Sequence, residues 1–100
     1  MTEEEAKKAL RGCRDRIDAV DRQLLLLLNE RTRIVQEIGR IKRQVRLPIY
    51  EPKREDEVYR NVTANNPGPL PAEALKRIFE RIIDEMRTVQ RIQMEKQNPC

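Results

Sequence analysis

Arg31 is a cation at a position of a helical repeat where the neighbouring repeats place aliphatic side chains, as at Leu27 and Ile34. A buried guanidinium without a partner is costly, so Arg31 requires an anion beside it. That anion is either a glutamate of a neighbouring helix, which makes the pair structural, or a bound ligand. Lys42 lies eleven residues further along, which is about 20° around an α-helix and about 16 Å along it. The two cations therefore face the same side, although Lys42 could also be a solvated side chain at the edge of that face.

Two carboxylates and an amide are further groups that could bind a ligand. Glu51 and Glu55 are spaced i,i+4 around Pro52 at the start of a predicted helix, where the helix dipole would explain both without a ligand. Arg54 lies between them and could serve only to pair with them. Gln90 lies at the edge of an apolar helix face, where most glutamines simply contact solvent. Each of these signals is weak when it is taken alone.

Several kinds of catalysis are excluded by residue types that the chain lacks. It contains no His and no Ser, which excludes Ser-His-Asp, Cys-His and histidine–metal mechanisms. Cys13 and Cys100 are too few for a four-ligand zinc site and too far apart for a CxxC redox pair, so we interpret both as free thiols. The glycines form neither a P-loop nor a GxGxxG turn. We therefore predict no metal and no cofactor.

The charge pattern favours a small anionic ligand at least as much as nucleic acid. The 100 residues include 21 Lys and Arg against 17 Asp and Glu, a net charge of +4, and the two signs alternate over much of the chain. The chain has one Phe, two Tyr and no Trp, so stacking platforms for single-stranded nucleic acid are not expected. The N-terminal residues have no apolar core and no membrane span follows them. The charge alone leaves nucleic acid possible, but the partner that we predict is a small anion, with no nucleic acid and no membrane, in a cytoplasmic protein.

A single long helix is predicted over residues 5–46. Apolar residues recur there at alternating spacings of three and four, and only Arg31 interrupts this heptad stripe. The stripe consists of Leu10, Cys13, Ile17, Val20, Leu24, Leu27, Arg31, Ile34, Ile38, Ile41 and Val45. Such a helix would be roughly 60 Å long, whereas a compact chain of this size has a radius of gyration of about 13 Å. The chain cannot cover the stripe by itself, so the helix needs a partner.

Two further helices are predicted in the rest of the chain. After a loop, Pro52 suits the first turn of a short helix, which ends in the turn-forming residues 65–69. A helix of medium length starts near Pro71 and carries apolar residues at helical spacing. No strand alternation is present. We predict one all-α domain over residues 1–100, built from one long, one short and one medium helix, with its core at about residues 10–93 and frayed tails.

Taken together and in order, these segments resemble the all-helical chorismate mutase family. The resemblance is carried by CRDRIDAVDRQLLLLLNERTRIVQEIGRIK, then PIYEPKRE and then IFERIIDEMRTVQ, and it covers roughly residues 10–93. The Arg-x-x-Ile-Asp-x-Val-Asp stretch that begins at Arg14 is its most specific element, and Glu-Arg and Gly-x-x-Lys elements follow at the expected distances. Members of this family rearrange chorismate to prephenate, the step that leads towards phenylalanine and tyrosine.

The resemblance implies a role for each of the polar residues. Arg14 and Arg31 match the family's two carboxylate-binding arginines, and Arg54 matches a further cationic position in the pocket. Lys42 and Gln90 match the pair that donates hydrogen bonds to the ether oxygen of the breaking bond.

The resemblance also implies contacts to the rest of the substrate. Glu51 and Glu55 match the acidic positions near the substrate's hydroxyl group. Met86 falls where a relative has a small hydroxyl side chain. Because a methionine cannot donate a hydrogen bond, we expect backbone or packing to replace that contact to the substrate.

This reaction suits a chain without His or Ser. The rearrangement is pericyclic and needs no nucleophile, proton transfer or cofactor, so the enzyme supplies a compact substrate conformation and electrostatic stabilisation. The two carboxylates of the substrate are suited to arginine forks. The ether oxygen gains negative charge as its bond breaks, so donors fixed beside it bind the transition state better than the ground state. We therefore predict Lys42, Gln90 and Arg31 as catalytic residues.

The spacing of the arginines predicts a dimer. Arg14 and Arg31 are seventeen residues apart, or about 26 Å along one helix, which a molecule the size of chorismate does not span. If Arg14 binds the ligand, it must come from a second chain. In an antiparallel pair with its two-fold axis near residue 25, Arg14 would face residues 36–37 of the partner, between Arg31 and Lys42. We predict an intertwined antiparallel homodimer with two composite sites.

Two other functions remain open from the sequence. Isochorismate pyruvate lyase acts on a similar dianion with the same fold, although Glu51 and Glu55 favour the mutase. A non-catalytic basic coiled-coil adaptor or nucleic-acid-binding module is also compatible with the heptads and the positive charge. In that case the charged residue in the stripe, the paired carboxylates and Gln90 would be coincidences.

Overall fold

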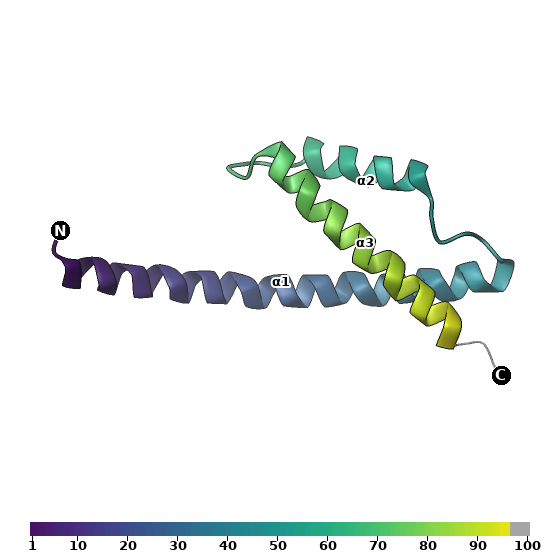
Figure 1. The fold of residues 1–100 in the computed structure, drawn as a ribbon, viewed down its shortest axis with the longest axis horizontal. Helices are drawn as coiled ribbons and strands as arrows, with labels where there is room; N and C mark the ends of the chain where they lie inside the picture. The colour runs from purple at the N-terminus through teal and green to yellow at the C-terminus, as the bar shows by residue number, and fades with distance from the viewer. Residues whose placement is uncertain (97–100) are drawn as a thin grey trace. The chain divides into compact units, whose positions relative to one another are not determined.

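The chain is all-helical over the part that the structure describes. The computed structural model describes residues 1–96, so Cys100 and the last four residues of the predicted C-terminal tail lie outside the described residues, whereas the tail up to Lys96 is helical. Within this range the chain forms α1 (Glu3–Val45), α2 (Pro52–Ala64) and α3 (Ala72–Lys96), and no strand (Figure 1). The predicted order of one long, one short and one medium helix is confirmed.

The helices belong to two compact units, Met1–Arg33 and Ile34–Cys100, so the boundary between the units falls within α1. The first unit consists of the N-terminal part of α1. Thr2 caps this helix: its hydroxyl accepts a hydrogen bond from the Glu5 N–H at 3.1 Å, and its carbonyl accepts one from the Ala6 N–H at 3.0 Å. The cap explains why α1 begins two residues before the predicted start.

The apolar side chains of the first unit are exposed to solvent. Those of the heptad stripe have exposed fractions between 49% and 61%, namely Leu10, Ile17, Val20, Leu24 and Leu27. Burial of so much apolar surface by a partner would be strongly favourable. None of the described helices is both long and apolar enough to cross a membrane.

The second unit packs the C-terminal part of α1, α2 and α3 together. α2 packs against α3, and α3 crosses the end of α1 (Figure 1). The buried apolar residues are Val35 of α1 with Ile83 and Met86 of α3. Gly39 of α1 allows the crossing, because a Cβ built there would lie 3.4 Å from both the backbone carbonyl oxygen of Gln90 and the Cβ of Gln93. The close approach fixes the position of Gln90 relative to the last turns of α1.

The segment between α1 and α2 begins with a left-handed residue. Arg46 has a φ of 57°, a conformation that a side chain makes unfavourable. The Leu47 N–H then donates a hydrogen bond to the Lys42 carbonyl at 2.9 Å, which is the 6→1 bond of a Schellman motif. This turn ends α1 three residues after Lys42 and directs Ile49 and Glu51 back towards the helix.

Candidate active site

Lys42 is the centre of a hydrogen-bonded cluster in the second unit. Only 7% of this residue is exposed, so the alternative of a solvated lysine is wrong. Its Nζ donates to the Ile49 carbonyl at 3.1 Å and to Gln90 Oε1 at 3.0 Å, and it pairs with Glu51 Oε1 at 3.0 Å. We call Lys42, Glu51, Gln90 and the Ile49 carbonyl the Lys42 cluster.

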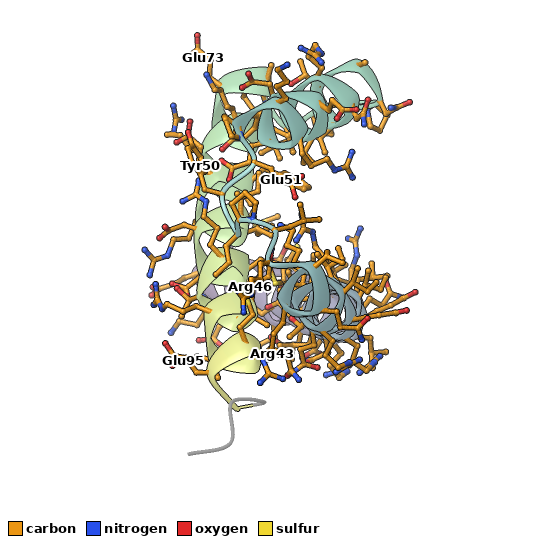
Figure 2. The ribbon with its side chains drawn as sticks, turned by 90° about the vertical axis from the view of Figure 1, so that its right-hand side faces the viewer. Arg43, Arg46, Tyr50, Glu51, Glu73 and Glu95 are labelled. Carbon is orange, nitrogen blue, oxygen red and sulfur yellow. The ribbon has the colours of Figure 1, made fainter. Side chains whose placement is uncertain are left out.

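The three acceptors of the Lys42 cluster come from different parts of the second unit. Gln90 is in α3, whereas Ile49 and Glu51 lie on the segment that leads from α1 into α2. Figure 2 labels Glu51 on this segment. An ammonium has three N–H donors, so these three acceptors match its capacity. Because Gln90 directs its oxygen at the ammonium, the donor end of its amide faces away from Nζ. All three donors of the ammonium are therefore in use, and an incoming acceptor atom has to displace one of these partners before Nζ can donate to it.

Glu51 joins α2 to this cluster. It is the N-cap residue of α2, but its side chain makes no capping hydrogen bond. The carboxylate instead pairs with Lys42 and keeps 44% of its side-chain surface exposed. An interaction with the dipole of α2 is therefore insufficient to explain the position of this carboxylate, and part of Glu51 stays accessible to a ligand.

Glu55 is held by an arginine that the sequence motifs did not single out. Arg87 of α3 donates from Nε to Glu55 Oε2 at 2.7 Å and from its terminal Nη2 to Oε1 at 2.6 Å. Only 16% of the Glu55 side chain is exposed. The hydrogen bonds from Arg87 lower the pKa of the Glu55 carboxyl below its ordinary value, although burial opposes them, and the positive charges of Arg87 and Lys42 act in the same direction. Glu55 is thus kept as an ionised acceptor.

The position of Arg87 in the sequence indicates that it needs an anionic partner. It lies four residues after Ile83 and three before Gln90, which places it on the same helix face. A cation on a face that is otherwise apolar needs an anionic partner, by the argument that singled out Arg31. None of the family motifs in the sequence assigns a role to Arg87.

The structure places the other predicted residues as follows. Arg54 is exposed on α2, and the described partners of the carboxylates that flank it are Lys42 and Arg87. Met86 is 8% exposed and belongs to the apolar core of the second unit. Arg14 and Arg31 belong to the first unit, where Arg14 is exposed and Arg31 is partly buried. Among the described residues, no group of His, Cys, Asp or Glu side chains could hold a metal ion.

A match to a family model shows which protein family the chain belongs to. Residues 13–91 match the family model described as chorismate mutase type II, which is well over half of the chain. The chain belongs to this family. The resemblance that the sequence motifs indicated is confirmed, and the Lys42 cluster is a candidate active site within a chorismate mutase fold.

Solved chorismate mutases have nearly the same extent as this chain. A chorismate mutase from Thermus thermophilus (form II) is 40% identical, with a TM-score of 0.80, and the match covers 91% of this chain and 99% of that one. A chorismate mutase from Helicobacter pylori, solved in complex with prephenate, is 30% identical with a TM-score of 0.84 and the same coverage.

The curated relatives are longer proteins. The bifunctional chorismate mutase/prephenate dehydratase of Aquifex aeolicus is 40% identical over 78 residues, which is 74% of this chain but 22% of that protein. A similar bifunctional protein from Neisseria gonorrhoeae is 38% identical over 78 residues and is matched over 21% of its length. The chain therefore spans less than a quarter of the length of these relatives.

Proposed function

We propose that this protein catalyses the rearrangement of chorismate to prephenate. The observation that carries the proposal is the hydrogen bond from the buried Lys42 ammonium to Gln90 Oε1, which holds the ammonium and the amide group of Gln90 next to each other. The reaction breaks a carbon–oxygen bond of an ether, and its oxygen gains negative charge in the transition state. An ammonium and an amide beside that oxygen stabilise the developing charge once the bound substrate has replaced Glu51 at Nζ.

The other residues bind and orient the substrate in this proposal. The hydroxyl group of the substrate lies near Glu51 and Glu55. The two carboxylates of the substrate bind Arg31 and the partner's Arg14, and Arg54 is a further cation of the pocket. Met86 packs against the substrate without donating a hydrogen bond to it. The substrate oxygen takes the place of an acceptor around Lys42, and the half-exposed Glu51 is the one that can move towards the hydroxyl. No cofactor takes part, because the bond rearrangement is intramolecular.

A homodimer completes each site in the same proposal. The exposed heptad stripe of the first unit supports it, because a second copy of this helix would bury the apolar side chains that solvent now surrounds. An antiparallel arrangement with the axis near residue 25 brings the partner's Arg14 between Arg31 and Lys42. The cytoplasmic location stays a prediction.

The direct test is turnover of chorismate by the purified protein. We expect the absorbance of chorismate to fall and prephenate to be identified as the product. The same protein incubated with isochorismate tests the lyase, which would release pyruvate and salicylate. Salt-dependent DNA binding without turnover of either substrate would instead favour the adaptor or nucleic-acid-binding module.

A further inference from the structure

We propose that Arg87 is a positioning residue that orients the carboxylate of Glu55 towards the substrate. The inference rests on the proposed function, in which Glu55 accepts a hydrogen bond from the substrate hydroxyl. Arg87 makes two parallel hydrogen bonds to Glu55, one to each carboxylate oxygen. A fork of this kind fixes the plane of the carboxylate as well as its distance, which a single donor cannot do.

The geometry leaves Glu55 able to bind a substrate. Each carboxylate oxygen has two acceptor positions, and Arg87 uses one on each. An ionised carboxylate is only an acceptor, so a hydroxyl group that approaches it must donate. Arg87 therefore determines both the direction of the remaining acceptor positions and the protonation state in which Glu55 meets the hydroxyl.

Arg87 is itself oriented by its neighbours in the second unit. The guanidinium carbon lies 5.3 Å from the centroid of the Tyr50 ring, within the range of a cation–π contact. A terminal nitrogen lies 3.4 Å from Oδ1 of Asp84, one turn earlier on α3. The side chain of Arg87 is 35% exposed, so its two hydrogen bonds to Glu55 are partly shielded from water. The Tyr50 ring and the Asp84 carboxylate therefore both contact the guanidinium that binds Glu55.

The charges around Glu55 give the proposal a pH signature. The guanidinium of Arg87 on α3 and the ammonium of Lys42 on α1 both lower the pKa of Glu55, and Arg87 makes the largest contribution. Removing Arg87 therefore raises the pKa of Glu55. If the substrate hydroxyl binds the ionised form, the acid limb of kcat/KM moves to higher pH.

The matched variants are Arg87→Ala, Arg87→Lys and Arg81→Ala. Arg81 is on the same helix and pairs with Asp84 and Glu85, but its side chain is 75% exposed. We expect Arg87→Ala to lose about 10- to 100-fold in kcat/KM, the scale of a misplaced substrate contact. Arg87→Lys keeps the charge without the fork, so it should keep the acid limb closer to that of wild type and still lose activity. Arg81→Ala should match wild type in rate and pH profile.

Combining Arg87→Ala with Glu55→Ala separates positioning from direct substrate binding. If Arg87 acts only through Glu55, its removal from the Glu55→Ala protein should change kcat/KM by less than about twofold. A full additional loss in that background means that Arg87 binds the substrate itself and overturns the proposal. A bridge that only stabilises the fold would lower Tm without moving the acid limb, and that result also rejects the proposal.

The pKa of Glu55 can be measured without any turnover, by NMR titration of its carboxyl carbon in wild type and in Arg87→Lys and Arg87→Ala. A pKa that is unchanged in Arg87→Ala overturns the proposal, and a raised pKa supports it. Failure of the wild type to convert chorismate would reject the proposed function instead. If Arg87→Ala does not fold, the Arg87→Lys protein decides, because an unaltered kcat/KM for a folded lysine variant contradicts the need for a fork.

Discussion

Lys42 Nζ lies 3.0 Å from Oε1 of Gln90, and this contact joins residues 48 positions apart in the chain. It depends on Gly39, one turn before Lys42, where the missing side chain lets the backbone of α3 approach α1. The contact between Lys42 and Gln90 therefore depends on how closely α1 and α3 pack at Gly39. A change in either the donors or the helix crossing should affect catalysis.

Removal of the ammonium should abolish most of the activity. We expect Lys42→Ala to lose at least about 10²–10³-fold in kcat, the scale seen when one preorganised donor is removed from a site that stabilises an oxyanion. Steady-state kinetics with chorismate measure this loss. A variant that turns over near the wild-type rate would show that Lys42 takes no part in the reaction.

We also expect Lys42→Ala to be less stable than the wild type. Removal of a solvated lysine at the edge of the stripe would change the stability little. Lys42 is instead buried, and it donates hydrogen bonds to the Ile49 carbonyl and to Gln90. Removing it leaves acceptors in a partly buried place without their donor, which costs about 1–3 kcal/mol for each fully buried group. Urea unfolding should show a clear loss of stability, and circular dichroism must confirm that the variant is folded before its rate is interpreted.

The Gln90→Glu variant should be active mainly at acid pH. In Gln90→Glu an ionised carboxylate would repel the charge that develops on the ether oxygen, whereas the protonated form can donate a hydrogen bond. Activity should therefore appear as the pH falls through the pKa of the new carboxyl, and the adjacent Lys42 ammonium moves that pKa downward. The wild type should show no matching loss of kcat above about pH 5, because an amide does not titrate. Identical pH profiles for the two proteins would place Gln90 outside the site.

A methyl group at the helix crossing tests whether packing positions the donors. In Gly39→Ala the new Cβ lies 3.4 Å from the Gln90 carbonyl oxygen and the Gln93 Cβ, at the short limit of ordinary van der Waals contact, so α3 has to move by no more than a few tenths of an ångström. The gain in helix propensity, about 1 kcal/mol, offsets this strain. We expect Tm to change little. We expect kcat to fall several-fold, which corresponds to a rise of about 1 kcal/mol in the activation free energy.

Gly12→Ala is the matched control for the helix crossing. A Cβ at Gly12 meets no atom within 4 Å, so this variant should gain the full helix propensity and raise Tm without a loss of kcat. Equal rates for the two alanine variants would contradict the link between the crossing at Gly39 and the reaction.

The sequence predicted the helices well because their signals are local. Proline positions, the heptad spacing and the turn residues near Asn65 determine the ends of the helices within one or two residues. The partners of the charged residues depend on contacts between distant segments, which periodicity does not encode. Hence only the family resemblance brought Lys42 and Gln90 together, and no motif assigned a partner to Glu55, which Arg87 binds from 32 residues away.

The composite site makes the strongest prediction. Arg14→Ala and Lys42→Ala should each be nearly inactive when prepared alone. If the two variants are unfolded together and refolded at equal concentrations, the chains pair at random. About half of the two-fold symmetric dimers then contain one chain of each variant. In each mixed dimer one site receives Lys42 from one chain and an intact Arg14 from the other, while the second site carries both substitutions.

About a quarter of all sites in this mixture should therefore recover wild-type activity. If Arg14 and Lys42 served one site within the same chain, every site would lack one of them and the mixture would stay inactive. Native mass spectrometry should confirm that mixed dimers have formed, since a failure to exchange chains would also give no recovery. Recovery near zero with mixed dimers present would reject the antiparallel two-chain site, and with it the placement of the two-fold axis in the leucine run near residue 25.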